Sequence, residues 1–168
     1  MEQTTLHGVN QQVSLEMMGW LCGILDGEGF IGLRGTGKRP YGSQMAIIQM
    51  VNTNNLIVEK YISLLKTLGV AFHIRELEQK YPRRKQWQIS TLGFKRCIKF
   101  LPLIIPYLVG KKEAAGMLLE LINSRLNLNS SSVGNSKRQW SDYENSLADK
   151  IKFSHRKSIF PKTSTTIC

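Results

Sequence analysis

Two carboxylates in the first part of the chain, Asp26 and Glu28, have the type and the spacing for metal chemistry. They close an apolar stretch that reads LCGILDGEG, and a single glycine separates them. Carboxylate oxygens are hard ligands that suit Mg²⁺, so a divalent cation could meet a phosphate here. Gly19, Gly23 and Gly27 recur every fourth residue and therefore share one helical face. If a second copy of this helix packed against that face, two acidic tips would lie close together.

The charge balance of the whole chain favours a polyanionic partner. Lysine and arginine number 23 and aspartate and glutamate 12, which gives a formal net charge of +11. A basic protein gains affinity for nucleic acid because each neutralised phosphate releases condensed counterions. Charge alone leaves open a basic surface with no nucleic-acid role. A membrane-surface role is disfavoured, because no segment reads as a basic amphipathic anchor.

The length predicts one globular domain over residues 1–168, with a core over about 14–153 and a basic tail over 154–168. The hydrophobic fraction is 42%, and no apolar run is long enough to cross a bilayer. Cys22, Cys97 and Cys168 have no CxxC spacing, which favours a reducing compartment. The first residues lack the features of a signal peptide. We therefore expect an intracellular protein, in the cytoplasm, the nucleoid or an organelle.

The periodicity of apolar residues predicts an alternation of helices and hairpins. Ser14 is placed to cap the first helix, which the glycines after residue 26 end, and Pro102 and Pro106 are expected to break the chain. The expected strands cover residues 30–38, 44–51, 70–78 and about 84–89, and the later helices cover 56–68, 94–100, 111–126 and 140–153. This order predicts an α+β fold with a four-stranded antiparallel sheet.

One face of the predicted sheet is apolar and is expected to pack on the helices. In the second strand, Met45, Ile47 and Val51 share a face. The other face of the sheet is expected to carry Arg34, Thr36, Lys38, Gln44, His73, Arg75, Gln79, Arg84, Gln86 and Gln88. Arginine and glutamine make bidentate contacts to guanine and adenine edges in the major groove. The alternative is an ordinary solvated sheet face, but the near absence of acidic residues favours DNA.

Residues 21–29 resemble the LAGLIDADG motif position by position, with conservative departures to Cys, Ile, Leu, Gly and Glu. The order of the elements also resembles the LAGLIDADG homing endonucleases, over roughly residues 14–122. The motif occurs once, and single-motif members of this family are homodimers. The resemblance therefore implies a homodimer whose paired motif helices meet, with Gly19, Leu21, Cys22 and Gly23 in the interface.

The resemblance also implies a set of catalytic residues. Glu28, with the backbone carbonyl of Gly27, would hold Mg²⁺ beside the scissile phosphate, with Mn²⁺ as a substitute and Ca²⁺ as an ion that binds without supporting cleavage. Asp26 matches the first acid of the motif, which closes the helix end. Lys111 would contact solvent or phosphate near the metal, with Lys112 next to it on the DNA. Without the resemblance, the interpretation of Lys111 as a solvated lysine at a helix start has the same weight as a functional role.

A polar residue at the end of the second strand positions water in this family. Asn52 and Thr53 both fall in this region, and neither matches the usual glutamine. The competing interpretation is that Asn52 caps the helix that follows.

The resemblance implies a homing endonuclease that cuts both strands of a long, roughly palindromic double-stranded DNA site. Cleavage across the minor groove would leave short 3′ overhangs and promote intron mobility. One rival is an RNA maturase that assists splicing of its host intron RNA, and a second is a DNA-binding protein of the same fold without catalysis. A third rival is an unrelated basic protein in which the motif is only a buried glycine-rich helix. The retained acid Glu28 favours cleavage.

Overall fold

The computed structural model describes residues 13–35, 44–77, 85–127 and 140–154. Its elements, in chain order, are α1 (Leu15–Glu28), β1 (Gly29–Gly35), β2 (Gln44–Asn52), α2 (Asn55–Thr67), β3 (His73–Leu77), β4 (Gln86–Leu92), α3 (Phe94–Ile104), the 3-10 helix η1 (Ile105–Tyr107), α4 (Lys112–Asn127) and α5 (Asp142–Ser154). The strands form one antiparallel sheet in the order β1-β2-β4-β3. This confirms the predicted α+β fold class and the two hairpins.

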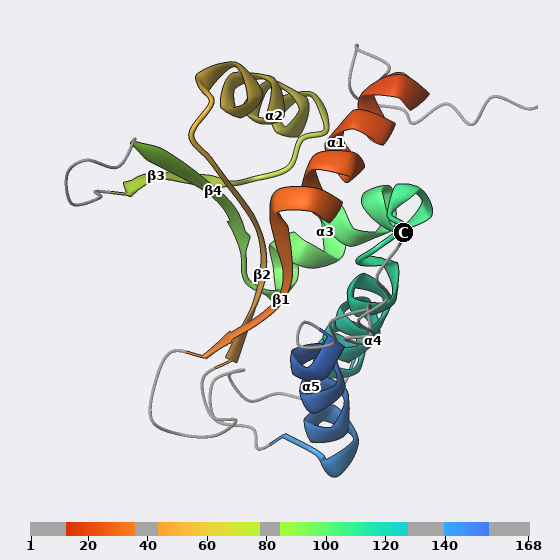
Figure 1. The fold of residues 1–168 in the computed structure, drawn as a ribbon. Helices are drawn as coiled ribbons and strands as arrows, with labels where there is room; N and C mark the ends of the chain where they lie inside the picture. Colours follow the sequence, from red (N-terminus) through yellow and green to blue (C-terminus); the bar gives the residue numbers. More distant parts are fainter. Residues whose placement is uncertain (1–12, 36–43, 78–84, 128–139, 155–168) are drawn as a thin grey trace, which may run out of the picture.

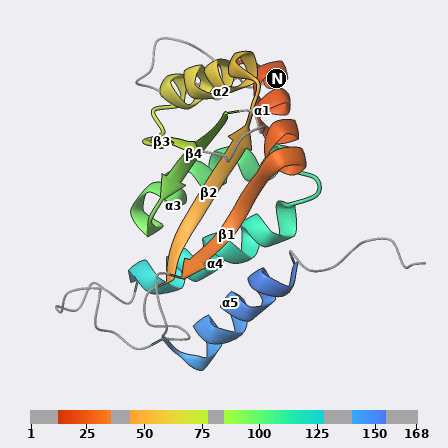
Figure 2. The same ribbon diagram turned by 60° about the vertical axis from the view of Figure 1, so that its left-hand side comes forward.

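The helices α1, α3 and α4 lie on one side of a curved sheet (Figure 1). Figure 2 shows α4 passing behind the strands and α5 lying against α4. We call the sheet face toward these helices the inner face and the opposite face the outer face. The core is one cluster in which the inner face meets α1, α3 and α4, through side chains such as Leu25, Ile48, Phe100 and Leu118. None of the described helices is long and apolar enough to cross a membrane.

The register of β2 reverses the predicted assignment of its two faces. Ile48 pairs with Ile31 and Met50 pairs with Ile89, and all four side chains belong to the core. Ile47 is therefore on the outer face, together with Met45 and Val51. The prediction failed because β2 is apolar on both faces, so alternation alone cannot tell which face is buried.

The helix α3 is longer than predicted. It continues through Pro102 to Ile104, and the chain leaves the α-helical geometry only at η1, which contains Pro106. Pro102 removes one backbone donor, at a cost of about 3 kcal/mol in a helix interior. Phe100, Leu101 and Ile104 are completely buried on both sides of it, and this burial offsets the cost.

The ends of α1 and α2 follow the sequence signals. Ser14 accepts a hydrogen bond from the Met17 amide, and Asn54 accepts one from the Leu56 amide. Gly29 makes the direct change from α1 to β1 possible, because a Cβ at this position would lie 2.5 Å from the Leu25 carbonyl oxygen. The predicted tail after residue 154 lies outside the described residues.

Candidate functional site

Glu28 is the last residue of α1, at the point where the chain turns into the first strand of the sheet. Glu28 is exposed, and so is the preceding residue, Gly27. The C-terminal end of a helix carries a partial negative charge, because its last carbonyls have no partner within the helix. An exposed carboxylate at this end therefore forms a local negative centre in a protein that is basic as a whole.

Asn52, the last residue of β2, fixes the orientation of Glu28. Its Nδ2 donates a hydrogen bond to Glu28 Oε2, and its Oδ1 accepts one from the Asn54 backbone N–H at 2.7 Å. Because the Oδ1 is held by a donor, the amide group must present its Nδ2 to the carboxylate. Asn52 is only 8% exposed, so the fold holds this donor in place. The helix cap itself is Asn54, so Asn52 does not serve as the cap.

Asp26 joins the end of α1 to the segment that precedes α4. Its Oδ2 accepts a hydrogen bond from the Val109 amide at 2.7 Å, and its Oδ1 accepts one from the Lys111 amide at 2.9 Å. Gly110 lies close against the same carboxylate, where an added Cβ would come within 3.7 Å of Asp26 Oδ1. Asp26 thus holds a distant segment, and both oxygens of its carboxylate are engaged in doing so.

Lys111 completes this junction from the other side. Its Nζ donates a hydrogen bond to the Leu25 carbonyl at 2.9 Å and another to the Asp26 carbonyl. The ammonium group therefore caps the C-terminal end of α1, where the helix dipole favours a cation. Partial burial lowers the pKa of Lys111, and the charge of Asp26 opposes this shift. The side chain is half-buried and braces the helix that carries Glu28.

The residues at this tip fit part of a divalent-metal site. Glu28 offers a carboxylate and Gly27 a main-chain carbonyl, and both are hard oxygen ligands. Within the described part of the chain, no three His, Cys, Asp or Glu side chains are grouped to hold a metal. A Mg²⁺ ion here would therefore need further oxygen ligands from water, from a phosphate or from a second subunit.

The exposed face of α1 is the face that carries the glycines. Gly19, Gly23 and Gly27 are exposed, and a Cβ at any of them would meet nothing within 4 Å. Leu21 and Cys22 were expected in the same interface, and this is wrong for both side chains.

Leu21 and Cys22 are completely buried in the core of their own chain. The Cys22 thiol donates a hydrogen bond to the Ile104 carbonyl at 3.6 Å, and burial, with the nearby charge of Asp26, raises its pKa to about 11.

Five of the residues predicted to bind DNA lie on the outer face: Arg34, His73, Arg75, Gln86 and Gln88. Gln44 does not, because its register opposite Gly35 places it on the inner face. Thr36, Lys38, Gln79 and Arg84 lie outside the described residues. Lys112 is exposed at the first position of α4, and Thr53 is exposed at the bend after β2; the hydrogen bond to Glu28 comes from its neighbour Asn52.

Sequence reasoning missed two outer-face residues, Phe30 and Gln49. With Arg34, Ile47 and Gln88 they line a shallow hollow of about 320 Å³, and Gln49 Oε1 accepts a hydrogen bond from Gln88 Nε2 at 2.8 Å. Their alternation with the buried residues Ile31, Ile48 and Met50 was the available signal.

No family model and no curated protein matches this sequence. Solved structures do match the fold. The homing endonuclease I-CvuI in complex with its target is 18% identical, with a TM-score of 0.58 over 89% of this chain and 85% of that chain. The group I intron-encoded homing endonuclease I-CeuI, complexed with DNA, is 16% identical, with a TM-score of 0.57 over 89% of this chain and 72% of that chain. The LAGLIDADG homing endonuclease I-GzeII, in complex with its DNA target, is 13% identical, with a TM-score of 0.53 over 80% of this chain and 42% of that chain.

Proposed function

We propose, on the premise that this chain has the LAGLIDADG homing endonuclease fold, that it is a site-specific DNA endonuclease. It acts as a homodimer on a long, roughly palindromic double-stranded DNA site. Divalent-metal catalysis cuts both strands and leaves short 3′ overhangs, and the cut promotes the mobility of a host intron. The structures of I-CvuI and I-CeuI are complexes with DNA, which supports DNA as the partner of the fold.

The contact between Glu28 and Asn52 is the observation that carries this proposal. An exposed carboxylate on a helix end is common, but here a nearly buried amide donor holds one of its oxygens. A carboxylate held in one orientation suits metal binding, because outer-shell partners fix the geometry of a ligand. Asp26 and Lys111 hold the same helix end on its other side. The tip is thus held by hydrogen bonds on both flanks and exposed at Glu28.

Glu28 and the Gly27 carbonyl would hold the metal, which supplies an activated water and charge neutralisation at the phosphate. Lys111 keeps the carbonyls of α1 occupied, so the end of the helix stays in one conformation. I-CvuI was crystallised with 2 mM Mg on one target and with 2 mM Ca on another, which supports divalent ions as ligands of this fold.

A second copy of the chain would supply the other half of the site. The glycine face of α1 allows a partner helix to approach until the backbones are in contact, because no side chain intervenes at Gly19, Gly23 or Gly27. Two such helices related by a two-fold axis would place two Glu28 carboxylates close together, one for each DNA strand. Arg75 and Gln88 on the outer face would then read bases in the flanking major grooves.

Cleavage of a plasmid tests the proposal. The plasmid carries the intronless junction of the gene that hosts the reading frame, and the full chain is incubated with it in Mg²⁺. We expect linear product with Mg²⁺, none with EDTA and none with Glu28→Gln. The control Glu59→Gln removes another exposed carboxylate, from α2, and should cleave as the wild type does. Linear product from Glu28→Gln would falsify the assignment of Glu28.

The two alternatives of the same fold predict different results. A DNA-binding protein without catalysis would shift the junction DNA in a gel and leave it uncut in every metal. An RNA maturase would bind its intron RNA and accelerate splicing with Glu28→Gln as well as with the wild type. The exposed, oriented carboxylate favours the nuclease, because neither alternative needs it.

A further inference from the structure

A second basic surface lies at the start of α3, away from the metal-site candidate. The helix α3 contains three cations, Lys95, Arg96 and Lys99, and no acidic residue. All three side chains are exposed. Lys95 and Lys99 are one turn apart, and like charges at this spacing destabilise a helix. A bound anion would relieve this repulsion.

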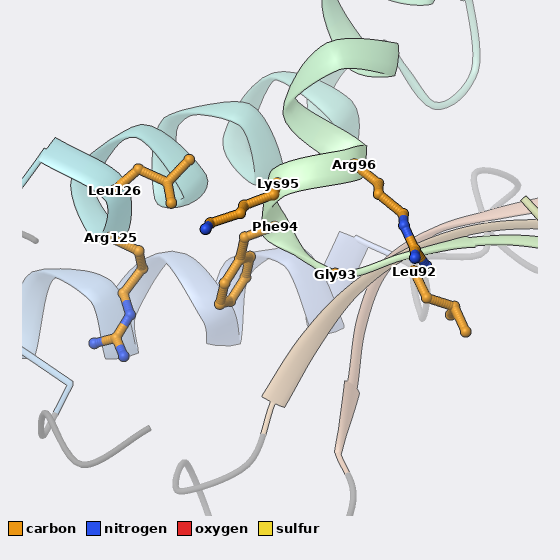
Figure 3. A pocket seen from close by; sticks show the side chains of 7 residues that line it. All are labelled: Leu92, Gly93, Phe94, Lys95, Arg96, Arg125 and Leu126. Carbon is orange, nitrogen blue, oxygen red and sulfur yellow. The ribbon is translucent and has the colours of Figure 1, made fainter. Parts of the chain in front are cut away.

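A hollow of about 340 Å³ opens beside these cations, between the start of α3 and the end of α4 (Figure 3). Its apolar part comes from Leu92, Phe94 and Leu126. In Figure 3, Lys95 extends over the Phe94 ring toward Arg125 and Leu126, whereas Arg96 points to the other side, along the sheet. The hollow thus combines an aromatic floor with a cationic rim.

The three cations that line the hollow, Lys95, Arg96 and Arg125, differ in the partners that their side chains already have. Arg125 is nearly buried, its Nη1 lies 3.2 Å from Glu144 Oε2, and its guanidinium lies over the Trp140 ring. Arg96 Nη1 forms a hydrogen bond with His73 Nε2 at 2.8 Å. Lys95 has no hydrogen bond or ion pair with any other described residue. Arg125 is therefore already paired, and Lys95 supplies a charge that no residue in the described part of the chain compensates.

We propose that this hollow binds one unpaired nucleotide of a single-stranded nucleic acid. The base stacks on Phe94 against Leu126, and Lys95 and Arg96 contact the phosphates on either side. Aromatic stacking with flanking cations is the chemistry by which proteins bind single strands. The volume is at the lower end of the range for ligand sites, about 300–1,000 Å³, so it suits one nucleotide. A duplex cannot enter, because its bases are stacked and paired.

The hollow borders the surface assigned to the duplex, through Leu92 and through the contact of Arg96 with His73, but most of its lining lies off the sheet. Apart from Leu92, its lining residues belong to α3, α4 or Gly93, which lies before α3. Gly93 has a φ of 90°, a left-handed conformation that lets β4 turn sharply into α3. A single strand of nucleic acid could therefore bind at the hollow while a DNA duplex lies on the outer face. RNA and DNA offer the same phosphates and base faces, so both are candidate sources of the strand.

Fluorescence anisotropy with labelled oligonucleotides of about twelve nucleotides tests this site on the full-length protein. The probes are oligouridine RNA, oligothymidine DNA and a mixed-sequence duplex, each without metal. At about 0.1 M salt, Lys95→Ala should weaken single-strand binding about fivefold and lower the slope of log affinity against log salt by about 0.7. Phe94→Leu, which retains an apolar side chain, should weaken it about tenfold.

The control Lys66→Ala removes an exposed lysine from α2 and should change single-strand affinity by less than about twofold. None of these variants should change the duplex affinity by more than that. A thermal melt shows whether Phe94→Leu folds. Lys95→Ala changes an exposed side chain, so it tests the site even if Phe94→Leu does not fold. The ratio of RNA to DNA affinity identifies the source of the strand. Absence of single-strand binding by the wild type, or equal losses in Lys95→Ala and Lys66→Ala, overturns the site whether or not the protein cleaves DNA.

Discussion

Replacing Asn52 by alanine should impair cleavage far more than it impairs folding. The variant loses a hydrogen bond to the charged Glu28 carboxylate and one to the Asn54 amide. The first is worth about 1.5 kcal/mol, the low end for charged partners because the exposed Glu28 regains water, and the second about 1 kcal/mol. We therefore expect a loss of about 2–3 kcal/mol in the free energy of unfolding, which an intact domain tolerates.

The effect on cleavage follows from the freedom that Glu28 gains. Loss of the residue that orients a metal ligand costs about 10–100-fold in metal affinity or activity. We expect Asn52→Ala to need more Mg²⁺ for half-maximal cleavage and to cut about 10–100-fold more slowly at limiting Mg²⁺. This range corresponds to about 1.4–2.7 kcal/mol in the free energy of activation.

The assay is a Mg²⁺ titration of plasmid linearisation, with the free energy of unfolding measured on the same samples by urea. Thr53→Ala is the matched variant, because Thr53 is the exposed neighbour of Asn52, and it is Asn52 that donates the hydrogen bond to Glu28. It should stay within about twofold of the wild type. An unchanged Mg²⁺ requirement and rate in Asn52→Ala, or equal losses in both variants, would refute a positioning role for Asn52.

Three further outcomes follow from the same region. Gly23→Leu should raise the stability of the monomer by up to about 1 kcal/mol, since its site is open and glycine is a poor helix former, yet abolish dimers in analytical ultracentrifugation. Dimers of unchanged mass would contradict the role of the glycine face. The pKa of Lys111 is lowered from 10.5 in the folded protein, so the unfolded chain binds this proton more tightly. The stability of the wild type relative to Lys111→Met, measured by urea melts, should therefore increase as the pH rises toward 10.5. A difference in stability that does not change with pH would rule out this shift. In a Cys168→Ser background, Cys22 should resist a thiol reagent at pH 8 until the chain unfolds, because burial raises its pKa to about 11. Rapid labelling of the folded protein at Cys22 would show that α1 is not packed as described.

The local features of the fold were predictable because their causes lie within a few residues. Ser14 caps α1 through an amide three residues away, and the glycines after Asp26 mark the end of the helix. Helical periodicity also indicated that Cys22 does not share the face of the glycines. The glycines recur every fourth residue on one face, so Leu21 and Cys22 had to point elsewhere. The motif resemblance placed them in the interface against this geometry.

The features that were not predicted depend on contacts between distant parts of the chain. Lys111 lies 86 residues from Leu25, whose carbonyl it caps, and nothing in the local sequence indicates that partner. Lys111 lies just before the start of α4, where a cation is unfavourable. Its ammonium group instead reaches the C-terminal end of α1, where a cation is favourable. The faces of β2 were ambiguous for a related reason. Both faces are apolar, and only the packing of α1 and α3 decides that Ile48 is in the core.

The junction between Asp26 and Lys111 has a consequence for the timing of synthesis. The two residues are 85 positions apart, and α1 leaves the ribosome well before its partner segment. At about 5–20 residues per second, the chain that ends at α1 waits roughly 4–17 s for Lys111 to be made. During this interval the carbonyls of Leu25 and Asp26 lack their cap, and Glu28 is on an unbraced helix end. In a nascent chain, the end of α1 that carries Glu28 therefore cannot reach its braced form before the segment that precedes α4 has emerged.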